Sequence, residues 1–155
     1  MTEIWFYHLQ RRPLERVLPT LLEKSLERGW RAVVQARTPE RLEALDEALW
    51  TYSDESFLAH GTAREGDPAD QPVYLTDGLE NPNGARLRIL VEGADVGEAI
   101  AAAGDDAYER IILIFDGDDE AELTGARAKW KKLKEQSRPM SYWRQNEDGR
   151  WEKIA

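Results

Sequence analysis

Positive charge gathers in the stretch RAKWKKLK, residues 127–134, where five basic residues surround one tryptophan in a chain of 155 residues with a formal net charge of -9. Arg127, Lys131 and Lys134 fall at positions i, i+4 and i+7, which places them on one face of a helix, with Trp130 adjoining. Cations that converge in this way can hold carboxylates by charge-assisted hydrogen bonds, and an indole can receive an aromatic ring. An acidic peptide is therefore one ligand that this pattern could bind.

A purely structural interpretation of the same stretch stays open. The lysines would then complement the negative end of the helix dipole and keep the surface soluble. Trp130 would pack into the core instead of lining a recess.

Charge is distributed unevenly along the chain. Residues 1–126 hold 12 basic and 26 acidic residues, a net charge of -14, whereas residues 127–155 hold 9 and 4, a net charge of +5. A body of such negative charge repels nucleic-acid phosphates at long range, so we expect no direct binding of DNA or RNA despite six tryptophans. The basic C-terminal part suits an acidic peptide better.

Few residues offer catalytic or metal-binding chemistry. There is no cysteine, and the two histidines, His8 and His60, stand in no recognisable metal or nucleophile motif. No phosphate-binding loop accompanies the acidic pair Asp46 and Glu47. The acidic stretch DGDDEAE (116–122) begins like a calcium-binding loop, but the chain lacks the glycine and the glutamate that such a loop needs at its sixth and twelfth positions. We expect no catalytic residue, no metal and no cofactor. The alternative is a degenerate nucleotide-binding or hydrolase enzyme of parallel-sheet type.

The lack of cysteine also favours a reducing compartment. The N-terminal sequence MTEIWFYHLQRR has an acidic residue where a signal peptide needs basic ones, and its apolar run is too short to span a bilayer. We therefore expect a cytoplasmic protein without membrane contact.

Hydrophobic patterns predict strands that alternate with helices. The expected strands are residues 3–9, 30–36, 72–76, 85–93 and 109–115. The expected helices are 13–29, with a kink or a short first turn at Pro19, then 38–50, 96–104 and 116–136, and a hairpin closes the chain over 140–155. This order predicts one domain, residues 1–155, of the α/β class: a three-layer α/β/α sandwich with a mostly parallel sheet and a C-terminal hairpin.

Several stretches together resemble the chi subunit of bacterial DNA polymerase III holoenzyme. They are FYHL, RLEALDEALWTYSDESFLAHG (41–61), QPVYLT…NPNG and an ending of the pattern R-x-x-W-K…YW-x-Q…G-x-W, in this order along nearly the whole chain. The block LDEALW…ESFLAH is the most specific of them. The resemblance implies a non-catalytic accessory subunit that links the polymerase clamp loader to single-stranded DNA-binding protein.

The resemblance also implies a binding site for the C-terminal tail of single-stranded DNA-binding protein, in which acidic residues precede a final phenylalanine. In family members a basic recess near the last helix receives this tail, and the matching positions here are Arg127 and Trp130, with Lys134 one further turn along. Lys131 joins them because its spacing from Arg127 places it on the same face of the helix. Leu123 stands where some relatives have a further basic residue, so the recess differs in detail.

A second surface implied by the resemblance joins chi to the psi subunit through aromatic residues that match Trp50 and Phe57. Such residues, if exposed, would explain the apolar SFLAH in an otherwise polar loop over 51–71, because exposed aromatic groups mark interfaces. The partner would be psi or another clamp-loader component. The alternative is that Phe57 folds back onto Trp50 as a local anchor.

Overall fold

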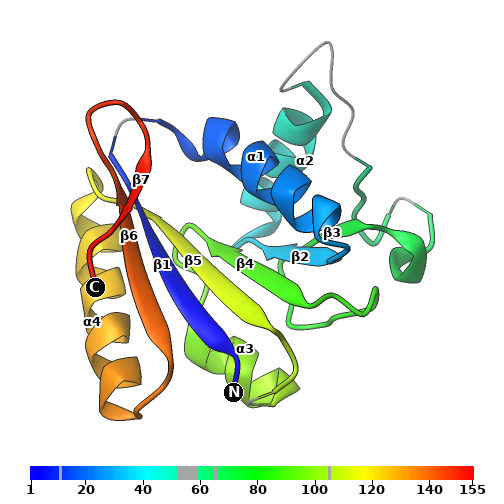
Figure 1. Ribbon diagram of the computed structural model, residues 1–155. Helices are drawn as coiled ribbons and strands as arrows, with labels where there is room; N and C mark the ends of the chain where they lie inside the picture. Colours follow the sequence, from blue (N-terminus) through cyan, green and yellow to red (C-terminus); the bar gives the residue numbers. More distant parts are fainter. Residues whose placement is uncertain (11, 52–58, 65, 105) are drawn as a thin grey trace.

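One sheet of seven strands organises the part of the chain that the computed structural model describes, namely residues 1–10, 12–51, 59–64, 66–104 and 106–155 (Figure 1). The strands are β1 (Glu3–Leu9), β2 (Ala32–Gln35), β3 (Val73–Thr76), β4 (Leu87–Val91), β5 (Arg110–Asp116), β6 (Met140–Gln145) and β7 (Trp151–Lys153). Their order in the sheet is β3-β2-β4-β5-β1-β6-β7. Every neighbouring pair is parallel except β6 and β7, which form the antiparallel C-terminal hairpin.

Helices cover both faces of this sheet (Figure 1). They are α1 (Leu14–Glu27), α2 (Pro39–Thr51), α3 (Val96–Ala103) and α4 (Glu120–Glu135). A short 3-10 helix, η1 (Pro68–Asp70), precedes β3 and buries none of its residues. Side chains of α1 and α2 share one hydrophobic core with the sheet, and side chains of α3 and α4 share another on the opposite face. The predicted three-layer sandwich with a mostly parallel sheet and a C-terminal hairpin is confirmed.

The apolar run ERIILIF shows why both faces are covered. Ile112 and Ile114 of β5 join the core under α1 and α2, whereas Ile111 and Leu113 join the core under α3 and α4. Because successive strand residues point to opposite faces, a strand with helices on both sides needs apolar residues at every position.

Helix α1 forms with Pro19 inside it. It runs from Leu14 to Glu27, so the predicted alternative of a short first turn that ends at the proline is wrong, and the alternative of a kink stays a prediction. Pro19 is buried, and its packing in the α1 core offsets the loss of one backbone hydrogen bond. The start of α2 is as expected, since the backbone N–H of Arg41 donates to Oγ1 of Thr38 at 3.3 Å.

Arg88, in the middle of β4, is fully buried, which sequence reasoning did not anticipate. Its guanidinium donates to the side-chain oxygen of Gln35 at 2.7 and 2.9 Å, to the carbonyls of Gly78 and Glu80 at 2.7 and 3.0 Å, and to the hydroxyl of Tyr108 at 3.1 Å. These bonds fasten the turn after β3 onto β4, although β2 lies between the two strands.

The outer edge of β3 carries a further backbone pairing. Gly61 forms an isolated parallel bridge with Tyr74: its N–H donates to the carbonyl of Val73 at 3.0 Å, and its carbonyl accepts from Leu75 at 2.9 Å. A Cβ at position 61 would be only 2.9 Å from the end of the Gln71 side chain, so any larger residue there would require that side chain to move.

Candidate functional site

Helix α4 positions the predicted tail-binding residues. It begins after Asp119, whose side chain accepts from the N–H of Glu122 at 3.1 Å, and acidic residues follow in its first turn. Ala126 and Leu133 are buried against the sheet, which fixes the rotation of the helix. The opposite face, which carries Arg127, Lys131 and Lys134, is exposed to solvent.

Trp130 lies between core and surface. The residue is half-buried, and its ring packs edge-to-face against Phe6, with centroids 5.2 Å apart, and against Tyr142, with centroids 5.6 Å apart. One side of the indole therefore contributes to the core under α4. The exposed remainder adjoins the cationic face.

The positive charges of Arg127 and Arg144 affect the pKa values of Tyr142 and His8, a contacting pair beside Trp130. Burial raises the pKa of Tyr142, and the positive charges of Arg127 and Arg144 oppose part of that rise. Burial also lowers the pKa of His8, and Arg144 and Arg127 lower it further. Arg144, in β6, was missed by sequence reasoning, because only the fold brings the hairpin next to α4. By contrast, the side-chain ammonium groups of Lys131 and Lys134 make no hydrogen bond or ion pair with the residues that the structure describes.

His8 fixes the position of Tyr142, whose hydroxyl lies 2.7 Å from Nδ1 of His8. The imidazole is buried in β1, as expected for a packed strand residue. Gly117 packs directly against the imidazole of His8, since a Cβ at position 117 would lie only 1.8 Å from Nε2 of that histidine. Any side chain at position 117 would therefore displace the histidine and its hydrogen bond to Tyr142.

The other two cations of the basic stretch face away from this site. Lys129 is half-buried, and its ammonium donates to the carbonyl of Ala94 at 3.2 Å, while burial lowers its pKa. Lys132 lines a groove of about 730 Å³ between α3 and α4, together with Asp95 and Glu98. The five charges that look like one cluster in the sequence thus divide between two sides of the helix.

The second predicted surface lies at the end of α2. Trp50 is 48% exposed, and its ring centroid lies 4.5 Å from that of His60. His60 is buried, and its Nε2 lies 3.1 Å from Oδ1 of Asp46 in α2, so this histidine anchors the following segment to the helix. Phe57 lies outside the described residues.

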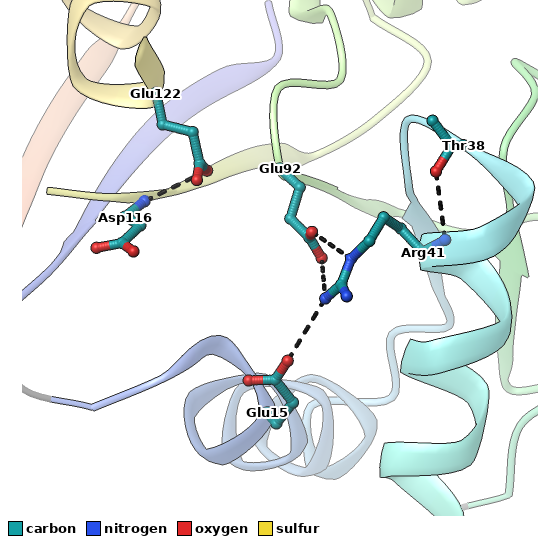
Figure 2. A network of polar contacts seen from close by, with 6 residues as sticks. All are labelled: Glu15, Thr38, Arg41, Glu92, Asp116 and Glu122. Carbon is teal, nitrogen blue, oxygen red and sulfur yellow. Dashed lines mark hydrogen bonds and ion pairs between the residues drawn. The ribbon is translucent and has the colours of Figure 1, made fainter. Parts of the chain in front are cut away.

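A crevice of about 300 Å³ opens at the carboxyl ends of β1, β4 and β5, and its polar network is shown in Figure 2. Arg41 from α2 points between two carboxylates: its Nη2 donates to Glu92 at 3.0 Å and lies 3.5 Å from Glu15 of α1. The hydrogen bond to Glu92 raises the pKa of Arg41. Glu92 has a φ of 53°, a left-handed conformation that costs non-glycine residues free energy.

The remaining carboxylates of this crevice repel one another. Burial raises the pKa of Glu122, and the negative charges of Asp119, Asp116 and Glu92 raise it further, although the N–H of Asp116 donates to Glu122 at 3.4 Å. Parallel α/β proteins bind nucleotides at this edge of the sheet, where backbone N–H groups or cations meet the phosphates. Here the acidic lining disfavours a phosphate. Within the described ranges, no three histidine or acidic side chains are grouped so as to hold a metal ion.

Comparison with known proteins gives two matches. Residues 1–141 match the protein family described as "DNA polymerase III chi subunit, HolC". The chain is also 30% identical over 156 residues to a protein of Rickettsia prowazekii (strain Madrid E) named "Probable DNA polymerase III subunit chi", an alignment that covers 100% of this chain and 93% of that protein. Among the residues described by the structure, no helix is both long and apolar enough to cross a membrane.

Proposed function

Because the chain belongs to the DNA polymerase III chi subunit family, we propose that it is a non-catalytic link between single-stranded DNA-binding protein and the clamp loader. The single observation that carries the proposal is the arrangement beside Trp130. There, the charges of Arg127 from α4 and Arg144 from β6 act on the same Tyr142 hydroxyl. An acidic chain end needs cations from more than one element together with an apolar contact surface, and this arrangement supplies both.

The tail of single-stranded DNA-binding protein would bind as follows. Arg127 forms a bidentate contact with the terminal carboxylate, and the half-buried indole of Trp130 packs against the final phenylalanine. Lys131 and Lys134, which are exposed on the same face as Arg127, attract the acidic residues that precede the final phenylalanine of the tail. A few charge-assisted bonds and one buried ring, less the cost of ordering the peptide, correspond to a dissociation constant on the order of micromolar.

Trp50 and Phe57 would form a separate surface for psi or another clamp-loader component. The 48% exposure of Trp50 supports this assignment, because large exposed aromatic residues are concentrated at interfaces. Trp50 lies in α2, the helix that follows β2. Three strands separate β2 from β6 in the sheet, so the clamp-loader surface and the tail-binding residues would be far enough apart for both partners to bind at once.

The competing assignment is a degenerate nucleotide-binding enzyme. Its natural site is the crevice in Figure 2, where Arg41 is already paired with Glu92 and Glu15 and the other charges are mostly carboxylates. Magnesium-dependent ATP turnover by the purified chain would favour the enzyme.

Titration of the purified chain with a labelled peptide of acidic residues ending in phenylalanine tests the tail site. Arg127→Ala should weaken binding about tenfold to a hundredfold, because it removes a charged donor. Lys132→Ala is the matched control: it removes one charge from the same helix, but from the side that faces α3. Equal loss in both variants would show attraction by net charge alone and would contradict the proposal.

The clamp-loader surface needs its own measurement. Trp50→Ala should weaken capture of clamp-loader components while the affinity for the acidic peptide stays within about twofold of the unmodified chain, because sites without shared contacts behave independently. Loss of peptide binding in a folded Trp50→Ala variant would argue against two separate surfaces.

A further inference from the structure

A second basic surface lies between α1 and the β6–β7 hairpin, in a groove of about 420 Å³. Its charged lining residues are all cations: Arg12, Arg16, Lys24 and Arg150. No described carboxylate contributes to this lining, although the chain carries a net charge of -9. The groove is therefore a local reversal of the overall charge.

These four cations are not used to hold the fold together. None of them forms an ion pair with a described carboxylate. Arg12 lies against the hairpin turn, where a Cβ at Gly149 would be 3.0 Å from its Nε, so a cation from the α1 side reaches across to the hairpin. Arg12 also lines the acidic crevice at the carboxyl ends of the strands, whereas Arg16, Lys24 and Arg150 do not. Cations without an ion-pair partner attract an anionic ligand.

The groove also contains a buried polar group with an unsatisfied atom. Gln145, at the end of β6, is 2% exposed, and its Oε1 has no hydrogen-bond partner among the described residues. Its Nε2 lies at the limit of hydrogen bonding, 3.5 Å from the carbonyl of Gly149. Buried amides are nearly always satisfied, so this side chain is available to a polar ligand or its water.

Aromatic side chains continue from the groove across the α1 face of the sheet. Four half-buried indoles pack against this core: Trp5, Trp30, Trp143 and Trp151. Tyr7 contacts Trp151 and Trp143, with ring centroids 4.5 and 6.4 Å away, and Trp143 stacks on Trp5 at 5.1 Å. Arg110 then lies 3.6 Å over Trp5 and 5.3 Å from Trp30. Indoles and guanidinium groups thus form one continuous path.

We propose that this groove and aromatic path bind single-stranded nucleic acid. The cations would contact successive phosphates, and bases would stack on the partly exposed indoles, which is how proteins bind single strands without reading sequence. An acidic peptide could use the cations, but it has no bases to stack on the exposed parts of the indoles. The path lies on the α1 face, whereas Trp130 and Arg127 belong to the α4 side, so this site is independent of the tail site.

The proposal revises the expectation drawn from net charge. At an ionic strength of about 0.1 M, charges more than about 10 Å apart are largely screened, so the nearby groove outweighs distant carboxylates. Four phosphate contacts give a steep salt dependence, in which a tenfold rise in salt weakens binding by roughly several hundredfold.

The first test measures the fluorescence anisotropy of a labelled oligothymidylate at an ionic strength of about 0.1 M, where distant charges are screened. Arg16→Glu with Lys24→Glu reverses two groove charges and should weaken binding by about tenfold or more. The matched control, Arg86→Glu with Lys132→Glu, changes the net charge equally at two exposed positions outside the groove, and should change affinity by less than about threefold. Circular dichroism and thermal melting check that both double variants fold. Equal losses in both, or no loss in the groove variant, overturn the proposal.

The second test separates nucleic acid from an acidic protein segment. An abasic phosphate chain of the same length should bind at least about tenfold more weakly than oligothymidylate, because it has no bases to stack on the indoles. A peptide of equal negative charge should compete poorly. If the abasic chain binds equally well, or if the peptide binds equally well and is lost with Arg16→Glu and Lys24→Glu, the site is a general anion site or a protein-docking site and the proposal fails.

Discussion

Arg88 and the cations of the α1–hairpin groove carry the same charge in opposite surroundings. Arg88 is fully buried and surrounded by the oxygens of Gln35, Gly78, Glu80 and Tyr108. The groove cations are exposed to solvent and form no ion pair with a described carboxylate. The difference separates cations that hold the fold together from cations that are free to bind a partner. Arg41, paired but only half-buried, lies between these extremes.

Arg88→Met should have the largest effect. Removal of the guanidinium leaves several buried oxygens without a donor, so we expect a loss of about 3–5 kcal/mol in the free energy of unfolding. Chemical denaturation monitored by circular dichroism measures it. A loss below about 1 kcal/mol would remove the distinction between buried and groove cations.

Arg41→Ala should have an intermediate effect. The side chain bridges Glu92 and Glu15, but it is 42% exposed, so solvent screens both ion pairs. We expect the free energy of unfolding to fall by about 0.5–1 kcal/mol at low salt, and by less in high salt. A loss equal to that of Arg88→Met would mean that exposure does not decide the strength of these contacts.

Glu122→Gln should be mildly stabilising at neutral pH. The pKa of Glu122 is raised by burial, so the folded chain holds its proton more tightly than the unfolded chain does. Stability from this group is therefore greatest below the unfolded pKa and is lost as the pH rises through the folded pKa. Glutamine stays neutral and avoids the cost of burying a charge, so we expect the free energy of unfolding to rise by about a few tenths of a kcal/mol at pH 7. The gain is small because the N-terminus of α4 partly favours the carboxylate. Thermal melts should show no gain in acid, below the unfolded pKa; a gain that persists there would contradict the sign.

Arg16→Ala with Lys24→Ala should have the smallest effect on folding. Neither side chain forms an ion pair with a described residue, so the free energy of unfolding should change by less than about 0.5 kcal/mol. Differential scanning calorimetry is sensitive enough to test this. A loss of more than about 1 kcal/mol would place these cations with Arg88, as parts of the fold.

The strands were predictable because the apolar runs are continuous. Residues 3–9 form β1 over the predicted range, and the run around Ile112 forms β5. Arg88 could not be predicted in the same way. An arginine inside a strand is normally exposed, and its burial depends on Gln35, which is 53 positions away, and on a turn that folds over β4.

The candidate sites were predictable only where one element carries them. The spacing of Arg127, Lys131 and Lys134 is a property of α4 alone, so the sequence could place them on one face. Arg144 and the groove could not be found, because each depends on segments far apart in the chain. Arg16 and Arg150, for example, line the same groove from α1 and from the hairpin.

The Gly61 bridge on β3 limits how partners can attach to this molecule. It occupies the outward-facing carbonyl of Val73 and the N–H of Leu75, two groups with which an incoming extended segment would otherwise pair. Strand addition at this edge would first require the Gly61 segment to detach. At the β3 edge, an approaching chain therefore meets a strand whose pairing groups are already used, and the same bridge hinders edge-to-edge pairing of β3 with a second copy of the molecule.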